Sequence, residues 1–341
     1  MSPPEKRTTK LPENVLPSNF FINCLFGDEK FENHIKQIEE NKSSDKFKSI
    51  IPIIDAQLGQ IIDEIKGGFR NGNNEDEAMC CRNVNYYFDL LYAIIKSPGQ
   101  LSNENTNNLI GQIKEKWEQV PKISDRNKCK GKTDLDSICK RSILKHLHDL
   151  KLDKMPIKTF SEEYKNYLSK KWKKIIAYTS GYYDNLYIKI ENDFIGIIDS
   201  YNNFLESSDP ICDIDLNDLS TEDIKISTNL EILMNSISLK KFKTNKDYVK
   251  GCYNKNYIDM LKIKTSSIQR INNILSSGIA ILGFSLILAV LYRFGPLGSL
   301  LRRCTKKKAE VNENINEEVI SELYDDSENE RSYISYDAVP H

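Results

Sequence analysis

Hydrophobic residues recur at helical spacing along most of this chain, in segments that end at glycine or proline. A first helix is predicted to begin at Pro52, because proline suits the first helical position, and to end at Gly67. Further helices are predicted for residues 78–96, 109–120 and 135–152. A long helical segment then follows to Phe204, with a capping box formed by Thr159 and Glu162 at its start and a bend at Gly181. Sustained strand-like alternation is missing, so the pattern predicts an all-α fold.

The C-terminal third of the chain changes character. A polar loop is expected at residues 207–221, another helix at 222–238, and a Lys- and Asn-rich helical stalk at 254–273. Ile274–Tyr292 then forms nineteen residues without a charge. As a helix this run would be about 28 Å long, close to the ~30 Å hydrocarbon thickness of a bilayer. It is therefore predicted to be a transmembrane helix.

These segments divide the chain into five parts. We expect a polar N-terminal segment (1–19), an α-helical ectodomain (20–253), a juxtamembrane stalk (254–273), the transmembrane helix (274–292) and a cytosolic tail (293–341). The N-terminal segment has no apolar stretch long enough for a cleavable signal peptide. The apolar run itself is therefore expected to direct translocation of the residues before it.

Local charge predicts the orientation, although the whole chain has a net charge of only −1. A basic cluster follows the apolar run and then gives way to an acidic tail; the cluster consists of Arg293, Arg302, Arg303, Lys306, Lys307 and Lys308. Such a flank stays cytosolic under the positive-inside rule and attracts anionic lipids of the inner leaflet. The contrast is modest, because Lys262, Lys264 and Arg270 lie before the run. The tail beyond the cluster is polar enough to be disordered on its own.

Cysteine usage favours the same orientation. Seven of the 8 cysteines precede the apolar run, and none forms a CxxC pair: Cys24, Cys80, Cys81, Cys129, Cys139, Cys212 and Cys252. This distribution predicts disulfides in an oxidising compartment, with one cysteine left over and the pairing unassigned. Buried thiols are the alternative for these residues, and a tail-anchored protein with its bulk in the cytosol is the alternative orientation. Cys304, inside the basic cluster, is a candidate for palmitoylation.

Motifs for catalysis or cofactor binding are missing: the chain has no P-loop, GxGxxG, GxSxG or HExxH sequence. We therefore expect no enzyme activity and no cofactor. His146 and His148 are two residues apart on a predicted helix, so they project to different faces and no metal site is expected. The basic run Lys170–Lys174 is predicted to be a solvated helix face with Trp172 turned to the core, and no nucleic-acid partner is expected.

Two short blocks resemble the PIR (Vir-type) variant antigens of Plasmodium malaria parasites. Gly278–Lys308 resembles the family's apolar span, its Y-[RK]-F-[TS]-P-[FL]-G-S-W segment and its basic stretch, with departures at Gly295 and Leu300. Cys81–Asp89 is similar to the family's C-R-x-[LF]-N-Y-[YW] pattern, and Arg331–Tyr336 to its tails. Absence of a signal peptide is usual in that family.

The resemblance implies a variant surface antigen with a helical ectodomain, displayed on the infected erythrocyte or on the parasite. Its implied role is immune evasion or adhesion, with a host receptor or an antibody as partner. An intracellular scaffold at parasite-induced membranes is the alternative function.

Overall fold

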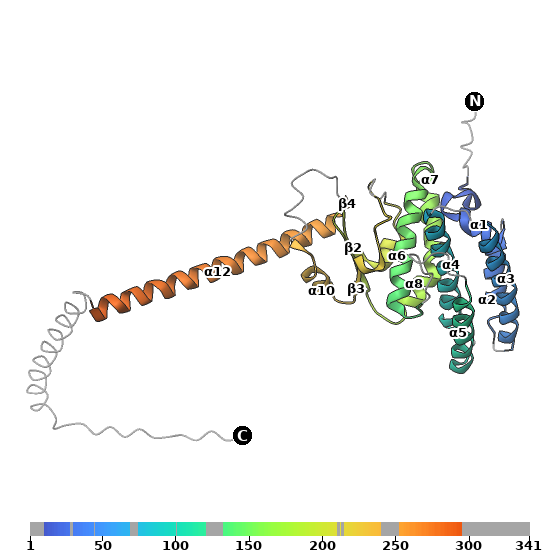
Figure 1. Ribbon diagram of the computed structural model, residues 1–341, viewed down its shortest axis with the longest axis horizontal. Helices are drawn as coiled ribbons and strands as arrows, with labels where there is room; N and C mark the ends of the chain where they lie inside the picture. The colour runs from blue at the N-terminus through green and yellow to red at the C-terminus, as the bar shows by residue number, and fades with distance from the viewer. Residues whose placement is uncertain are drawn as a thin grey trace, which may run out of the picture. The chain divides into compact units, whose positions relative to one another are not determined.

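The computed structural model describes residues 10–27, 30–43, 45–68, 74–99, 101–120, 132–209, 212, 215–239 and 252–294 (Figure 1). The chain divides into two units, the first ending at Thr265 and the second beginning at Ser266. We call the described part of the first unit the head.

The head begins with short elements that pack into its core: η1 (Glu13–Val15), η2 (Pro17–Asn19), α1 (Phe20–Phe26) and α2 (Lys30–Glu40). Leu11 and Leu16 are buried in the main hydrophobic core. Ser18 donates from its backbone N and its Oγ to the buried Asp153 carboxylate, over 2.9 and 2.6 Å. Within the predicted N-terminal polar segment (1–19), Leu11 and Leu16 thus contribute apolar side chains to the core of the head.

The helical part of the head is built around α4. Its elements are η3 (Phe47–Ser49), α3 (Ile50–Gly68), α4 (Asn74–Lys96), α5 (Asn103–Glu118), α6 (Leu135–Leu152), α7 (Lys154–Thr159) and α8 (Ser161–Ser180). α4 contacts α1, α5, α6 and α8, and every residue from Tyr86 to Ile95 is buried. A helix that is apolar on all sides needs neighbours on all sides. The Phe88 ring stacks on the Trp117 ring of α5 with 4.4 Å between centroids.

The predicted helices are confirmed with shifted ends. α6 has the predicted bounds, whereas α3 begins two residues before Pro52, which lies in its first turn. The predicted capping box is wrong: Thr159 ends α7 and its Oγ1 donates to the Met155 carbonyl. α8 begins at Ser161, and its N-cap residue, Phe160, makes no side-chain cap.

A four-stranded sheet corrects the all-α prediction, although the described residues are mostly helical. Its strands are β1 (Tyr187–Glu191), β2 (Ile195–Ser200), β3 (Ile224–Ser227) and β4 (Cys252–Tyr253), in the order β3-β1-β2-β4. β1 pairs antiparallel with β2 and β3, and β2 pairs parallel with β4. The short elements α9 (Tyr201–Glu206), η4 (Thr221–Asp223) and α10 (Leu230–Asn235) complete this region. A helix predicted at 222–238 is thus replaced by η4, β3 and α10.

The β1–β2 hairpin forms where the continuation of a long helix was predicted. Asn185 has a positive φ of 60°, which stops helical propagation before β1. The Asn192 Oδ1 atom accepts hydrogen bonds from the backbone N atoms of Phe194 and Ile195, both at 2.9 Å, and so closes the turn. Ile188 and Ile190 are fully buried. These two residues alternate with Lys189 and Glu191, which is a strand signal. The helical spacing of Leu186, Ile190, Phe194 and Ile198 concealed that signal.

Candidate functional site

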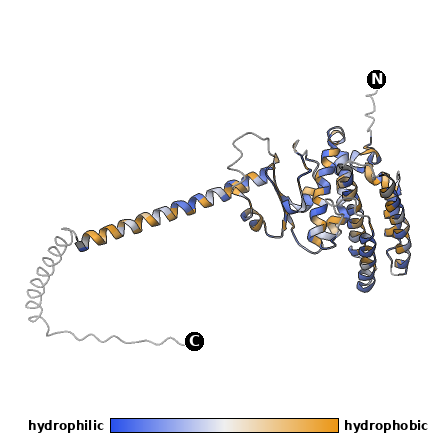
Figure 2. Ribbon diagram, viewed as in Figure 1, coloured by the Kyte–Doolittle hydropathy of each residue, from blue (hydrophilic) through white to orange (hydrophobic). Residues whose placement is uncertain are grey.

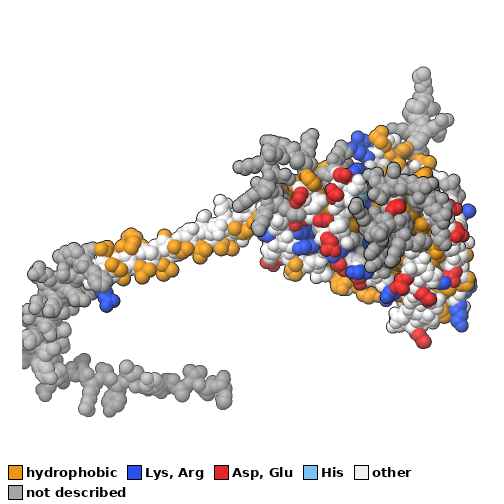
Figure 3. All heavy atoms as spheres, in the orientation of Figure 1, with side chains coloured by type: hydrophobic (Ala, Val, Ile, Leu, Met, Phe, Trp, Pro, Cys, Tyr) orange, Lys and Arg blue, Asp and Glu red, His pale blue; other side chains and the backbone are white. Residues whose placement is uncertain are grey.

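The longest described helix, α12 (Lys255–Phe294), contains the whole predicted apolar span and all but the first residue of the predicted stalk. Of the helices that the structure describes, it is the one long and apolar enough to cross a membrane. Its apolar side chains from Ile274 to Leu291 are exposed, and hydrophobic positions predominate along this part of the helix in the view drawn (Figures 2 and 3). An exposed apolar surface of this size indicates that a membrane or an apolar partner covers it.

Two serine hydroxyls within the apolar run form hydrogen bonds to the helix itself. The Ser277 and Ser285 hydroxyls donate to the carbonyls of Asn273 and Ile281, four residues earlier, both over 2.8 Å. Because hydrocarbon offers no hydrogen-bond partner, internal bonding of this kind is what a membrane span requires. The run is therefore chemically suited to lipid along its length.

Asn254 fixes the beginning of α12 to the edge of the sheet. Its Nδ2 donates to the Ile198 carbonyl over 2.9 Å, and its Oδ1 accepts from the Ile198 backbone N over 3.2 Å. The same Oδ1 accepts from the backbone N of Tyr257 over 2.9 Å, which caps the helix. One side chain thus continues the pairing of β2 and starts α12. We call this attachment of α12 to the sheet the junction.

Apolar packing at the junction depends on a glycine. Tyr257 and Leu261 of α12 pack with Ile198 of β2 and Ile237 in a second, smaller core cluster. A Cβ atom on Gly196 would lie 2.5 Å from the Tyr253 ring and 2.6 Å from the Tyr257 ring. The close approach of these rings to β2 therefore requires glycine at this position.

Glu191 forms several of the polar contacts at the junction. Its carboxylate accepts from the Tyr257 hydroxyl and the Ser238 backbone N, both over 2.8 Å, and pairs with the buried Lys189 ammonium. Burial alone would raise the pKa of Glu191, but these hydrogen bonds outweigh it and hold the pKa below its usual value. Lys264 of α12 donates to the carbonyls of Asn235 and Ile237, both over 2.6 Å. The first turns of α12 are therefore part of the head.

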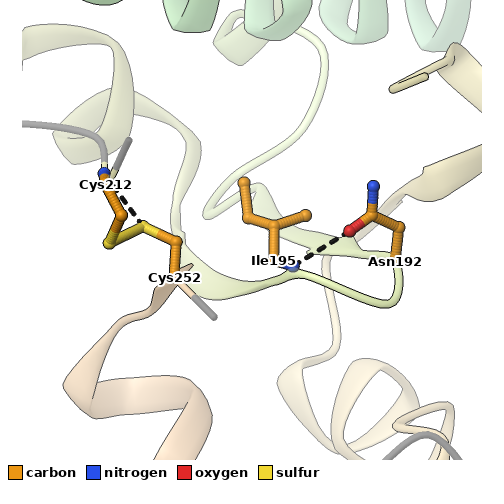
Figure 4. The surroundings of a disulfide bond; sticks show 4 residues. All are labelled: Asn192, Ile195, Cys212 and Cys252. Atoms are coloured by element: carbon orange, nitrogen blue, oxygen red, sulfur yellow. Dashed lines mark hydrogen bonds between the residues drawn. A yellow bond between two sulfur atoms is a disulfide. The ribbon is translucent and has the colours of Figure 1, made fainter. Parts of the chain in front are cut away.

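A disulfide closes the junction beside β4. Cys212 is bonded to Cys252, with 5.3 Å between their Cα atoms, and the Cys212 backbone N lies 3.2 Å from the Cys252 sulfur (Figure 4). Because Cys252 stands two residues before Asn254, the bridge ties the chain immediately before α12 to a segment 40 residues earlier. Cys81 of α4 is disulfide-bonded as well.

The other cysteines differ from the expected bridging set. Cys80 and Cys139 are buried thiols, which is the alternative that the sequence left open, and Cys24 is an exposed thiol. Burial raises the pKa of the Cys80 and Cys139 thiols to about 12, so both stay protonated at neutral pH. They occupy the core as small apolar side chains. Cys129 and Cys304 lie outside the described residues.

The basic cluster is mostly beyond the described part of the chain. Arg293 lies in the last turn of α12, where a cation suits the helix dipole. Arg302, Arg303, Lys306, Lys307 and Lys308 lie outside the described residues.

The block Cys81–Asp89 has a structural explanation within α4. Its side chains Tyr86, Tyr87 and Phe88 are buried, and Asp89 accepts two hydrogen bonds from Arg141 of α6, over 2.6 and 3.0 Å. These contacts pack α4 against its neighbours. The block therefore acts in core assembly.

Within the described residues, the geometry supports neither a metal site nor a fully solvated run at Lys170–Lys174. No group of three metal-ligating side chains is placed to hold an ion in the part of the chain that the structure describes. His146 is fully buried between the Trp172 and Phe204 rings, and its Nε2 is 3.1 Å from the Ser207 carbonyl. Trp172 is fully buried, as predicted, but the Lys171 side chain is only 6% exposed because it pairs with Asp149.

Asn254, Gly196, Glu191 and Lys264 were not singled out by sequence. An Asn directly before a periodic helix is a capping signal and could have identified Asn254. Gly196 and Glu191 carry no comparable signal, because their roles depend on tyrosines about sixty residues away in the sequence.

Comparison with known proteins bears on the C-terminal part of the chain. Residues 243–339 match the family model described as Plasmodium vivax Vir protein. The match takes in β4, the junction residues Tyr253–Leu261 and all of α12. No curated protein and no solved structure matched the chain. The family match supports assigning this chain to the Vir/PIR-type proteins of Plasmodium.

Proposed function

We propose that this protein is a single-pass surface antigen that displays its head outside the membrane and takes part in immune evasion or adhesion to a host receptor. The observation that carries the proposal is α12, whose apolar run is exposed while its first turns are bound into the head by Asn254, Tyr257 and Lys264. A helix attached in this way would connect a folded head to a membrane span. The assignment to a family of variant surface antigens supports the same role.

The charges that flank α12 support the proposed orientation. Lys264, before the apolar run, donates to carbonyls of the head, and Lys262 pairs with Asp259 over 3.4 Å. The positive-inside rule counts Lys and Arg residues whether or not they are paired, and Lys262, Lys264 and Arg270 before the run are fewer than the six cations of the basic cluster. The basic cluster that follows the run then dominates, which favours a cytosolic tail.

Disulfide chemistry favours the same side for the head. The Cys212–Cys252 bridge links the segment between α9 and η4 to β4, just before α12, and bridges of this kind persist in oxidising compartments. Cys80 and Cys139, which remain thiols, favour neither side because their burial protects them from oxidants.

Protease treatment of intact infected erythrocytes tests the proposal. An antibody against the head should lose its signal after mild trypsin treatment of intact cells, while a tag on the tail remains attached to membranes. Permeabilised cells, in which both signals are lost, provide the control for protease access. Full protection of the head in intact cells, with loss after permeabilisation, would contradict the proposal and favour the intracellular scaffold.

A further inference from the structure

The helical part of the head contains a pocket that the proposed display function does not use. It has a volume of about 600 Å³ and lies between residues 11–14, α1, α2, α4, α6 and α8. Four lysines contribute to its lining: Lys145, Lys170, Lys171 and Lys174. A volume of this size falls within the range of about 300–1,000 Å³ that is typical of small-ligand sites.

The inner part of the pocket holds two buried cations against one anion. The Nζ atoms of Lys145 and Lys171 lie 2.6 and 2.7 Å from the two oxygens of Asp149, and all three side chains are at most 6% exposed. One carboxylate cannot neutralise two ammonium groups, so one positive charge remains uncompensated. A buried excess charge is costly unless a counter-ion reaches it.

Aromatic rings hold these ammonium groups in place without neutralising them. The Lys171 Nζ lies 5.5 Å from the Tyr86 ring centre and 5.4 Å from that of Tyr167. The Lys145 Nζ lies 5.7 Å from the Tyr86 ring centre. Such cation–π contacts orient an ammonium group and offset part of its desolvation. They leave its net charge available to an anion.

Within the described residues, the carboxylates near the pocket entrance form no ion pair with Lys145 or Lys171. Glu13 pairs with Lys170 over 3.8 Å, and Glu39 pairs with Lys174. Glu32 lines the pocket and makes no ion pair within the described residues, but burial raises its pKa, and Lys174 and Lys171 are close enough to offset this larger effect in part. Its charge opposes that of an incoming anion, so it is a determinant of affinity that a substitution can test.

The remaining wall of the pocket has an apolar side. Phe31 and Ile35 of α2 and Leu90 of α4 line it, and all three are buried. We propose that the pocket binds a small organic anion, with its phosphate or carboxylate group against Lys145 and Lys171 and its apolar part against Phe31, Ile35 and Leu90. The proposal does not depend on which side of the membrane the head lies.

Titration calorimetry on the full chain in detergent tests this site with three probes: inorganic phosphate, phenyl phosphate and phenol, at constant ionic strength. Phenyl phosphate should bind saturably and at least ten-fold more tightly than inorganic phosphate, because it also fills the apolar side. Phenol, which lacks the charge, should bind at least ten-fold more weakly than phenyl phosphate. Absence of saturable binding by phenyl phosphate, or equal binding of phenol, overturns the proposal.

Substitution of Lys145 identifies the charge responsible. Lys145→Met leaves the Asp149–Lys171 pair in a one-to-one balance, so the variant should fold while its affinity for phenyl phosphate falls at least ten-fold. The matched control is Lys140→Met on the same helix; Lys140 pairs with Asp136 over 2.7 Å and does not line the pocket. An unchanged affinity in Lys145→Met, or an equal loss in Lys140→Met, overturns the assignment.

Glu32→Gln provides a second variant at an exposed position, where folding is not at risk. Removing this negative charge from the pocket lining should raise the affinity for phenyl phosphate two- to three-fold. A lower or unchanged affinity overturns the proposed placement of the anion. This variant keeps the proposal testable if Lys145→Met fails to give the circular dichroism spectrum of the wild type.

Discussion

At the scale of single residues, Gly196 determines how closely α12 can approach the sheet. An alanine there would place its Cβ within 2.7 Å of atoms in the Tyr253 and Tyr257 rings. Both rings are fixed by neighbours, since the Tyr257 hydroxyl donates to Glu191. The clash must therefore be relieved by moving α12 or β2.

Gly196→Ala should lower the free energy of unfolding by about 1–3 kcal/mol, as overpacking of a close contact does. Urea unfolding of the full chain in detergent measures the change. Gly111→Ala in α5 is the matched control: no atom lies within 4 Å of the added Cβ, so alanine should stabilise that helix by about 0.5–1 kcal/mol. Equal effects of the two substitutions would contradict the proposed close approach.

His146 makes the head sensitive to acid. Burial lowers the pKa of His146 to about 4, although the Ser207 carbonyl near its Nε2 partly offsets this effect. In the unfolded chain the imidazole takes up a proton below its usual pKa of 6.5. Between pH 6.5 and about 4 the unfolded state therefore binds a proton that the folded state does not, and stability falls as the pH falls.

His146→Gln should make the dependence of stability on pH shallower by about 1.4 kcal/mol per pH unit within this window. Urea unfolding at a series of pH values between 4 and 6.5 gives the slope. Leu147→Met, a buried substitution at the next residue without a titrating group, should leave the slope unchanged. A His146→Gln variant with the wild-type slope would show that His146 is protonated equally in both states.

At the scale of elements, three separate interactions stabilise the junction within a few residues of each other. The Cys212–Cys252 bridge, the Asn254 cap and the Tyr257 packing all act on the chain where β4 becomes α12. β4 has only two residues, so its pairing with β2 would be weak without the bridge and the side chain of Asn254. The disulfide should therefore make a large contribution to stability.

Cys212→Ser combined with Cys252→Ser should lower the free energy of unfolding by about 4 kcal/mol, because the bridge closes a loop of 40 residues in the unfolded chain. The measurement is urea unfolding of the full chain without reductant. Cys24→Ser, which changes an exposed thiol, should alter stability by less than about 0.5 kcal/mol. A loss in the double variant no larger than that in the control would contradict this role of the bridge.

The sequence predicted the helices better than the strands. α6 was predicted with its correct ends because Ile143, Leu147 and Leu150 recur at helical spacing and are buried. The β1–β2 hairpin was missed because Leu186, Ile190, Phe194 and Ile198 also stand four residues apart. Only contacts with β3, β4 and α12 select the extended conformation, and no local pattern contains those contacts.

At the scale of the whole molecule, the exposed apolar surface of α12 determines which medium can surround the protein. Leu282 and Leu286 are 66% and 67% exposed, one turn apart in the middle of the apolar run. In water such a surface would drive aggregation, whereas in a bilayer it is matched to the hydrocarbon. The proposed display function requires this helix to be inserted.

Leu282→Arg combined with Leu286→Arg should release the protein from membranes in an alkaline carbonate wash, because each arginine costs about 2.5–3.5 kcal/mol at the centre of a spanning helix. Immunoblotting of the pellet and supernatant gives the retained fraction. Ile232→Arg, at a head residue that is 59% exposed, should leave the protein in the membrane pellet. Retention of the double variant in the pellet would contradict insertion of α12.

The sequence by itself determined the features that depend on local patterns: the helices around α4, the inward orientation of Trp172, and an uncharged run long enough for a bilayer. These follow from the spacing of apolar residues within a few turns of one helix. The tertiary structure alone decided which cysteines are bridged, that Asn254 and Gly196 attach α12 to the sheet, and that Lys145 and Lys171 share Asp149. Each of these depends on residues between 22 and 61 positions apart being brought together by packing, and a pattern along the chain does not encode such distances in space.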